Sequence, residues 1–87
     1  MDWTGFDRFH IDLKRPVLLV RGSRGVLGCG YFKIETFNKT GEAAATVTGV
    51  NDFEAMAGAQ LVAVSDAAAA MGLAPGMTGA EALERFR

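Results

Sequence analysis

The chain has 87 residues, of which 49% are hydrophobic and 22% are charged, and its formal net charge is −1. This length supports one hydrophobic core, so we expect a single domain over residues 1–87, and the composition excludes an intrinsically disordered chain. The small net charge argues against nucleic acid or a membrane surface as a partner, and no apolar run reaches the roughly 20 residues that span a bilayer.

The chain contains one cysteine, Cys29. A single cysteine forms no internal disulfide and lacks the paired thiolates of a structural zinc site, so we expect no metal ion and no other cofactor. Residues 1–15 lack the apolar segment of a signal peptide, which predicts a cytoplasmic location.

The two halves of the chain differ in composition. Residues 1–40 carry seven Lys or Arg, four Asp or Glu and six of the eight aromatic residues, whereas residues 41–87 carry two Arg, six Asp or Glu and every alanine. Aromatic residues suit strands and alanine suits helices, so the composition predicts a strand-rich first half and a helix-rich second half.

Three strands are predicted in the first half. Residues 9–13 alternate apolar and polar side chains, which indicates a half-buried strand with Phe9, Ile11 and Leu13 on one face. Residues 17–20 are apolar on both faces, as in a central strand, and glycine-containing turn residues separate them from a strand at 26–32. The second and third strands therefore form a β-hairpin.

A short helix and a fourth strand follow. Residues 34–40 predict a helix that ends at Gly41, because glycine commonly follows the last helical residue. Residues 43–50 predict a strand with Thr46 and Thr48 on the face opposite Ala45 and Val47.

The second half contains three further helix signals. Asn51 and Glu54 resemble a capping box for a short helix ending near Gly58, and a strand is predicted at residues 60–64. Ser65 is suited to cap a helix over residues 66–71 that ends at Gly72. Thr78 and Glu81 form a second capping box, which opens a terminal helix with Ala82, Leu83 and Phe86 as its buried stripe.

These elements predict an α+β fold in one small domain. We expect a β-rich N-terminal half with a hairpin, and a mixed sheet packed by short helices from the C-terminal half.

Gly28 and Gly30 flank the only thiol, within a strand that glycine weakens. The surrounding glycines fit neither a dinucleotide-binding loop nor a P-loop, because Lys33 and the Tyr31–Phe32 pair occupy the positions that would contact phosphate. Either another backbone packs closely on these glycines, or a substrate approaches Cys29 there. Cys29 is therefore a candidate catalytic nucleophile, and Gly28 and Gly30 are candidate ligand-binding positions.

Four more polar residues are candidates for ligand binding or catalysis. Asn38 and Lys39, just before Gly41, are candidate ligand-binding residues for an anion, although they also suit a solvated helix end. His10 and Asp12 share one strand face, and they complete a Cys-His-Asp set with Cys29 only if the first strand lies beside the third.

Four ordered motifs resemble one family. They are Gly28-Cys29-Gly30-Tyr31-Phe32, then Ile34-Glu35-Thr36 with Asn38-Lys39, then Ala43-Ala44-Ala45 with Thr48-Gly49-Val50, and Gly76-Met77-Thr78-Gly79. From Pro16 onward the chain is similar to the YunC-like family, domain of unknown function 1805. The resemblance implies a small α+β fold whose N-terminal β region forms a tetramer, and it implies no activity.

Two hypotheses for function follow. The first is a self-associating module, a homotetramer, that binds a small ligand or a protein partner. The second is a cysteine-dependent enzyme, a hydrolase or an acyl-transfer enzyme, with Cys29 as its nucleophile. An activated thiolate distinguishes the second from the first, so the sequence leaves open whether the protein is an enzyme.

Overall fold

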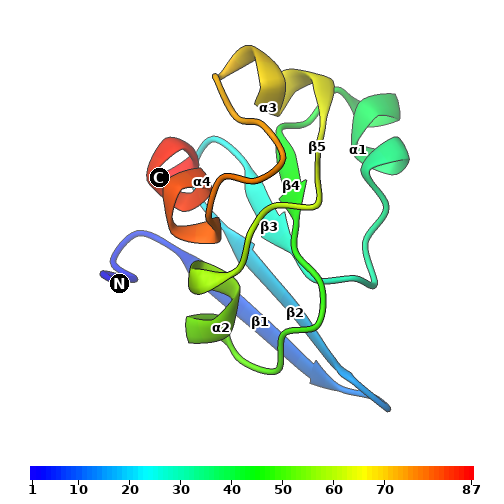
Figure 1. Ribbon diagram of the computed structural model, residues 1–87, viewed down its shortest axis with the longest axis vertical. Helices are drawn as coiled ribbons and strands as arrows, with labels where there is room; N and C mark the ends of the chain where they lie inside the picture. Colours follow the sequence, from blue (N-terminus) through cyan, green and yellow to red (C-terminus); the bar gives the residue numbers. More distant parts are fainter.

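The computed structural model describes residues 1–87 as five strands and four helices (Figure 1). The elements in chain order are β1 (Asp7–Asp12), β2 (Pro16–Arg21), β3 (Val26–Gly28), α1 (Ile34–Thr40), β4 (Ala44–Thr46), α2 (Phe53–Gly58), β5 (Ala63–Val64), α3 (Asp66–Ala70) and α4 (Gly79–Phe86). None of these helices has both the length and the apolar character that crossing a bilayer would require.

The strands form one mixed sheet in the order β1-β2-β3-β4-β5. β3 and β4 run parallel, with α1 in the connection between them, and the other neighbouring pairs are antiparallel. The expected α+β fold, the mixed sheet and the hairpin of the second and third strands are confirmed.

The register divides the strand residues between two faces of the sheet. Leu19 pairs with Gly28 and Gly28 with Thr46, so these three side-chain positions share one face. We call it the outer face; it also holds Phe9, Ile11 and Val17. The opposite face, which we call the core face, holds Leu18, Val20, Leu27 and Ala45.

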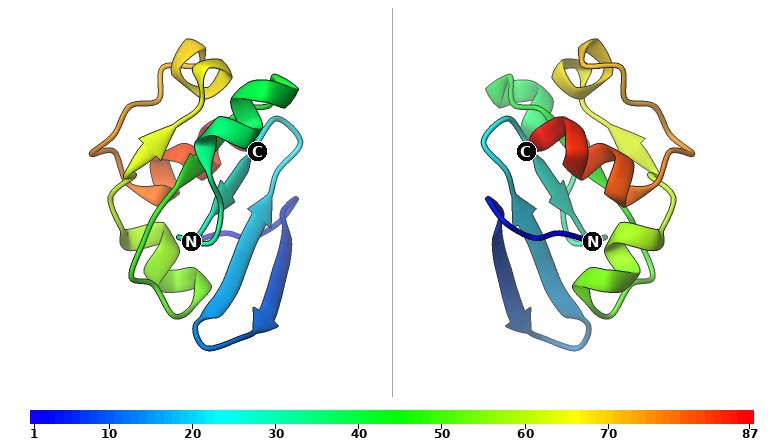
Figure 2. Two further views of the ribbon diagram at one scale, coloured as in Figure 1. Left: turned by 90° about the vertical axis from the view of Figure 1, so that its right-hand side faces the viewer. Right: turned by 90° about the vertical axis from the view of Figure 1, so that its left-hand side faces the viewer.

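Helices cover the two faces unequally. Figure 2 views the sheet from its two sides, with α2 and α4 in front on one side and α1 on the other. The main hydrophobic cluster combines core-face strand residues with Met56 of α2 and Leu83 and Phe86 of α4, all fully buried. On the outer face, α1 lies over part of the sheet and leaves β1 and β2 uncovered (Figure 2).

Local sequence signals predict the ends of three of the helices correctly. Thr78 and Glu81 form the expected capping box of α4, and the Ser65 hydroxyl accepts a hydrogen bond from the Ala68 backbone N–H at the start of α3. Gly41 follows α1 with a φ of 78°, the left-handed conformation that glycine adopts without strain. The cap of α2 differs from expectation, because Asp52 rather than Asn51 accepts the hydrogen bond from Ala55 N.

Tertiary structure shortens several predicted strands. The third strand ends at Gly28 instead of continuing to Phe32, the fourth covers only Ala44–Thr46, and the fifth only Ala63–Val64. Sequence alternation extends beyond these limits, but a strand lasts only as long as its neighbour stays paired with it. The first strand was expected to be half-buried, yet all six residues of β1 are exposed.

Candidate functional site

Cys29 follows β3 directly and is 3% exposed. Its Sγ atom accepts a hydrogen bond from the Leu18 backbone N–H at 3.3 Å, and its thiol donates to the Pro16 carbonyl oxygen at 3.8 Å. Both partners belong to the neighbouring strand β2. The thiol therefore occupies a position where β3, already ended, offers no backbone carbonyl to Leu18.

A cavity of about 250 Å³ adjoins this thiol. Its lining includes Cys29 and Gly30 on one side, with Arg15, Pro16, Tyr31, Gly49 and Val50 around them. The Arg15 side chain donates to the Asn51 Oδ1 atom at 3.2 Å, so a positive charge stands beside the cavity. A small molecule in this cavity would therefore lie beside Cys29 and Arg15.

His10 and Asp12 form the expected pair, with His10 Nε2 2.9 Å from Asp12 Oδ1. However, β2 lies between β1 and β3. Strands two positions apart in a sheet are separated by roughly 10 Å. The condition for a Cys-His-Asp set, the first strand beside the third, is therefore not met. The His10 ring instead lies edge-on to Phe53 of α2, with ring centroids 6.3 Å apart.

The two glycines beside Cys29 have different surroundings. A Cβ atom at Gly28 would lie 2.7 Å from the Phe32 ring, so a side chain four residues further along the chain, and not another backbone, packs closely there. A Cβ atom at Gly30 would meet only Thr48 Cγ2 at 3.5 Å, an ordinary van der Waals distance. The close approach expected at Gly30 is absent, and Gly30 lines the cavity beside Cys29 instead.

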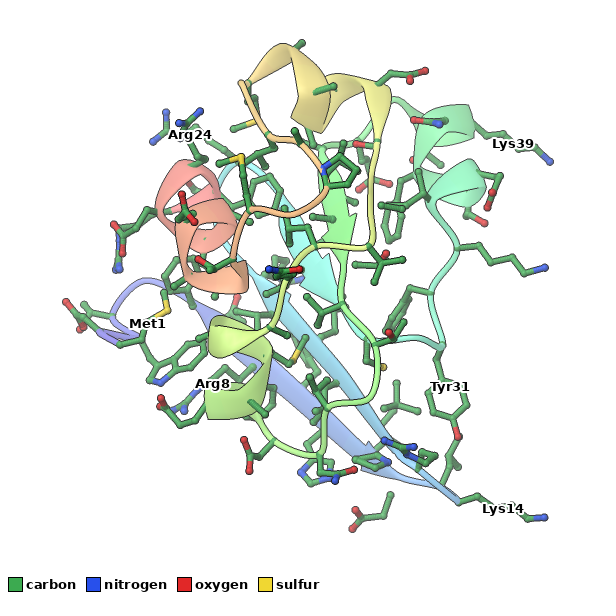
Figure 3. All side chains as sticks on the ribbon, in the orientation of Figure 1. Met1, Arg8, Lys14, Arg24, Tyr31 and Lys39 are labelled. Atoms are coloured by element: carbon green, nitrogen blue, oxygen red, sulfur yellow. The ribbon has the colours of Figure 1, made fainter.

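Asn38 and Lys39 are adjacent in α1, but their side chains have different surroundings. The Asn38 Oδ1 atom accepts a hydrogen bond from Asp66 N at 2.8 Å, which ties α1 to the first residue of α3. Lys39 lines a second cleft, between α1 and the sheet, and its side chain extends outward into solvent (Figure 3). Asn38 is thus used structurally, while Lys39 remains available to a ligand.

Sequence reasoning missed the buried polar residue of the second cleft. Thr46 is 5% exposed and lines this cleft from β4. The alternation of residues 43–50 correctly put Thr46 and Thr48 on the face opposite Ala45 and Val47. Alternation alone does not say whether a helix closes against that face or stands away from it.

A family model described as "Domain of unknown function (DUF1805)" matches residues 28–86. The chain belongs to the DUF1805 family. The matched segment begins at Gly28, the last residue of β3, so it contains Cys29 and Gly30. Strands β1 and β2 and the rest of β3 precede it.

One solved structure resembles the whole DUF1805 domain. It is a protein of unknown function, TA1206, from Thermoplasma acidophilum, with 34% sequence identity and a TM-score of 0.91 over 94% of this chain and 81% of that chain. No curated protein sequence matches significantly. The family model gives the family and the solved structure supports the fold, and neither description names an activity.

Proposed function

We propose that this DUF1805 domain is a self-associating module, assembled as a homotetramer through β1 and β2, that also binds a small ligand or a protein partner. The observation that carries the proposal is the uncovered outer face of β1 and β2. The free thiol of Cys29 suits the reducing cytoplasm, which we propose as its location.

The outer face of the β1–β2 hairpin is apolar and exposed. Phe9 is 42% exposed, Ile11 and Leu13 are each 59% exposed, and Val17 and Leu19 beside them are half-buried. Single exposed apolar residues are ordinary, but a contiguous apolar patch on a small domain marks a contact surface. Because β1 buries none of its six residues, its apolar side chains add little to the core of one chain and suit contact with another.

The free edge of β1 fits a second copy of itself. β1 is the edge strand, so half of its backbone hydrogen-bonding groups face no neighbour within the chain. In an antiparallel pair of two copies centred on His10, Phe9 of one copy lies opposite Ile11 of the other. Arg8 then lies opposite Asp12, which pairs opposite charges across the interface.

The two neighbouring registers of the same parity are less complementary. The register centred on Phe9 would place the acidic Asp7 opposite the apolar Ile11 and would set Arg8 opposite His10. The register centred on Ile11 would set Arg8 opposite Lys14, a pair of like charges. A shift by a single residue would bring outer-face and core-face side chains together. The apolar pair of Phe9 with Ile11 and the oppositely charged pair of Arg8 with Asp12 therefore favour the register centred on His10.

Edge pairing by itself leaves the outer face open. Two copies joined at β1 present one long sheet whose apolar outer face spans both hairpins. Two such dimers packed through this face, with sheets about 10 Å apart, would cover Phe9, Ile11, Val17 and Leu19 in all four chains. The two kinds of contact together produce the tetramer.

One observation favours the alternative, a hydrolase or acyl-transfer enzyme with Cys29 as nucleophile. Cys29 and Arg15 both line the cavity of about 250 Å³. Against it, the thiol is shared between two backbone groups of β2, an arrangement that serves the sheet. We therefore place self-association first.

Light scattering coupled to size-exclusion chromatography tests the assembly. We expect a mass four times the 9.2 kDa of one chain. Arg8→Glu and Asp12→Arg should each lower the mass, because each sets like charges opposite each other at β1, and the double variant should restore it. The circular dichroism spectrum of each variant should stay unchanged, because both side chains are exposed.

Lys14→Glu is the matched control. It reverses a charge at the tip of the hairpin, outside the paired residues, and Lys14 points into solvent (Figure 3). It should leave the mass unchanged. A wild-type chain that elutes at 9.2 kDa would contradict self-association, and a double variant that stays dissociated would contradict the register centred on His10.

A further inference from the structure

A cleft of about 580 Å³ separates α1 from the sheet edge formed by β4 and β5. Helix α1 contacts β4, but none of its seven residues is fully buried, so the helix covers this part of the sheet incompletely. The cleft has apolar walls, Ile34 on α1 and Val62 just before β5, and Thr46 of β4 is the buried residue of its lining. It is large enough for a small organic molecule.

Thr46 is the unusual residue of this cleft. The residue as a whole is 95% buried, and its hydroxyl forms no hydrogen bond within the chain. The other buried hydroxyl, that of Ser65, is fully used: it donates to Glu42 O and accepts from Ala44 N and Ala68 N. No fully covered polar side-chain atom lacks a partner in the structure, so the Thr46 oxygen must reach the cleft.

The charges lining the cleft are mainly positive. Lys33 and Lys39 lie on the side formed by α1 and its preceding residue, and Glu35 is the only acidic residue in the lining. The Lys39 side chain reaches outward (Figure 3), so its ammonium group attracts an anion at the cleft entrance. Such exposed charges act over about 8 Å at physiological salt.

We infer that this cleft binds a small organic anion, a carboxylate or a phosphate ester with a short apolar body. The anionic oxygen accepts a hydrogen bond from the Thr46 hydroxyl. The apolar body lies between Ile34 and Val62, and the two lysines compensate the charge. This assignment rests on the ligand-binding half of the proposed function and is independent of the assembly through β1.

Nuclear magnetic resonance titration with four probes of equal chain length tests the ligand class. Butyrate and butyl phosphate carry the anionic group, 1-butanol lacks the charge, and butylammonium reverses it. We expect saturable shifts of the amide signals of Thr46, Thr48, Ile34 and Val62 with the two anions and not with the other two probes. Whichever anion binds more tightly identifies a carboxylate or a phosphate ester as the source.

Two variants separate a binding role for Thr46 from a structural one. Thr46→Val keeps the shape and removes the hydroxyl, and it should weaken binding of the tighter anion about tenfold, the value of one hydrogen bond to a charged group. Its melting temperature should stay equal or rise, because no intramolecular hydrogen bond is lost. Thr40→Val is the matched control. Thr40 lies outside the cleft, and its one hydroxyl proton is shared between Phe37 O and Glu42 Oε1, so this variant should melt earlier and bind normally.

Several results would overturn the assignment. They are equal binding of butyrate and 1-butanol, no saturable shift with either anion, unchanged affinity in Thr46→Val, and shifts confined to β1 and β2. Light scattering measures the assembly separately, so a dissociated chain that still binds the anion would refute the tetramer alone. A tetramer without anion binding would refute the cleft site alone.

Discussion

On the core face of the sheet, Leu18, Val20 and Leu27 are completely buried under α2 and α4, whereas on the outer face Phe9 and Ile11 are about half exposed. Both sets lie on strands and both are apolar. The difference is in the helices: α4 contributes three fully buried side chains, and α1 contributes none.

This contrast indicates that the two faces of the sheet have different roles. The core face holds the chain together, and Arg24 N donates to the Phe86 carbonyl oxygen to fix the last helix to the hairpin turn. On the outer face, the apolar side chains of β1 and β2 and the cleft beside α1 both lie at the surface. Stability should therefore depend on the core face, and contacts with other molecules on the outer face.

The largest effect is expected when a core-face residue and an outer-face residue are each replaced by alanine and the losses of stability are compared. Phe86→Ala should lower the free energy of unfolding by about 3–5 kcal/mol, because its ring is completely buried. Ile11→Ala, at a concentration where the chain is monomeric, should cost less than about 1 kcal/mol, since most of its side chain already meets water. Urea unfolding followed by circular dichroism measures both, and equal losses would contradict the division between the faces.

The next prediction compares the effects of alanine at Gly28 and at Gly30 on stability. Gly28→Ala should cost about 1–3 kcal/mol, because the new Cβ would push against the Phe32 ring. Gly30→Ala has room beside Thr48 and should leave stability unchanged or raise it by about 0.4–1 kcal/mol. Thermal melts of the two variants decide this, and equal destabilisation would show that the segment after β3 packs more tightly than the structure describes.

Substitutions of Cys29 test whether its thiol has a structural or a catalytic role. Cys29→Ala leaves the Leu18 N–H without its acceptor and should cost about 1–3 kcal/mol, whereas Cys29→Ser supplies an oxygen and should recover part of that loss. Urea unfolding of both variants measures the difference.

The same residue gives an independent chemical readout. Because the thiol is almost completely buried, iodoacetamide should modify the folded chain much more slowly than the chain in denaturant. Rapid modification of the folded chain at neutral pH would instead support Cys29 as a nucleophile.

The smallest effect concerns the cap of α4, the helix that covers the core face. Hydrogen bonds from the backbone N–H and the hydroxyl of Thr78 hold the pKa of Glu81 below its ordinary value. A carboxyl whose pKa is lower in the folded state stabilises the fold above its unfolded pKa, and this contribution disappears as the pH falls through the folded pKa. The contribution should therefore be lost below about pH 4.

Glu81→Gln measures this term. The melting temperature of the variant should fall less than that of the wild type between neutral pH and about pH 3, because glutamine does not titrate. The slope should flatten without vanishing, since hydrogen bonds from Thr4 and from Arg87 also lower the pKa values of Asp2 and Glu84. Identical slopes would show that the cap does not depend on the charge of Glu81.

Helix ends were the most predictable part of the fold. The capping box of Thr78 and Glu81, the cap at Ser65 and the stop at Gly41 depend on hydrogen bonds and backbone angles within a few residues. Strand limits were less predictable, because the residues after Gly28 alternate like a strand and yet have no partner to pair with. The candidate site was predicted in part: Lys39 and Gly30 line clefts, while Asn38 and Gly28 make structural contacts.

Short-range geometry was enough to predict which segments are helices, most of the helix ends, and which side chains of a strand share a face. The tertiary structure alone decided the strand order, and with it the separation of His10 from Cys29. It also decided that a cleft lined by Thr46 remains between α1 and the sheet and that Phe9 and Ile11 stay uncovered. These outcomes depend on which elements far apart in the chain pack together, and alternation of apolar and polar residues shows only that a face is apolar, not what covers it.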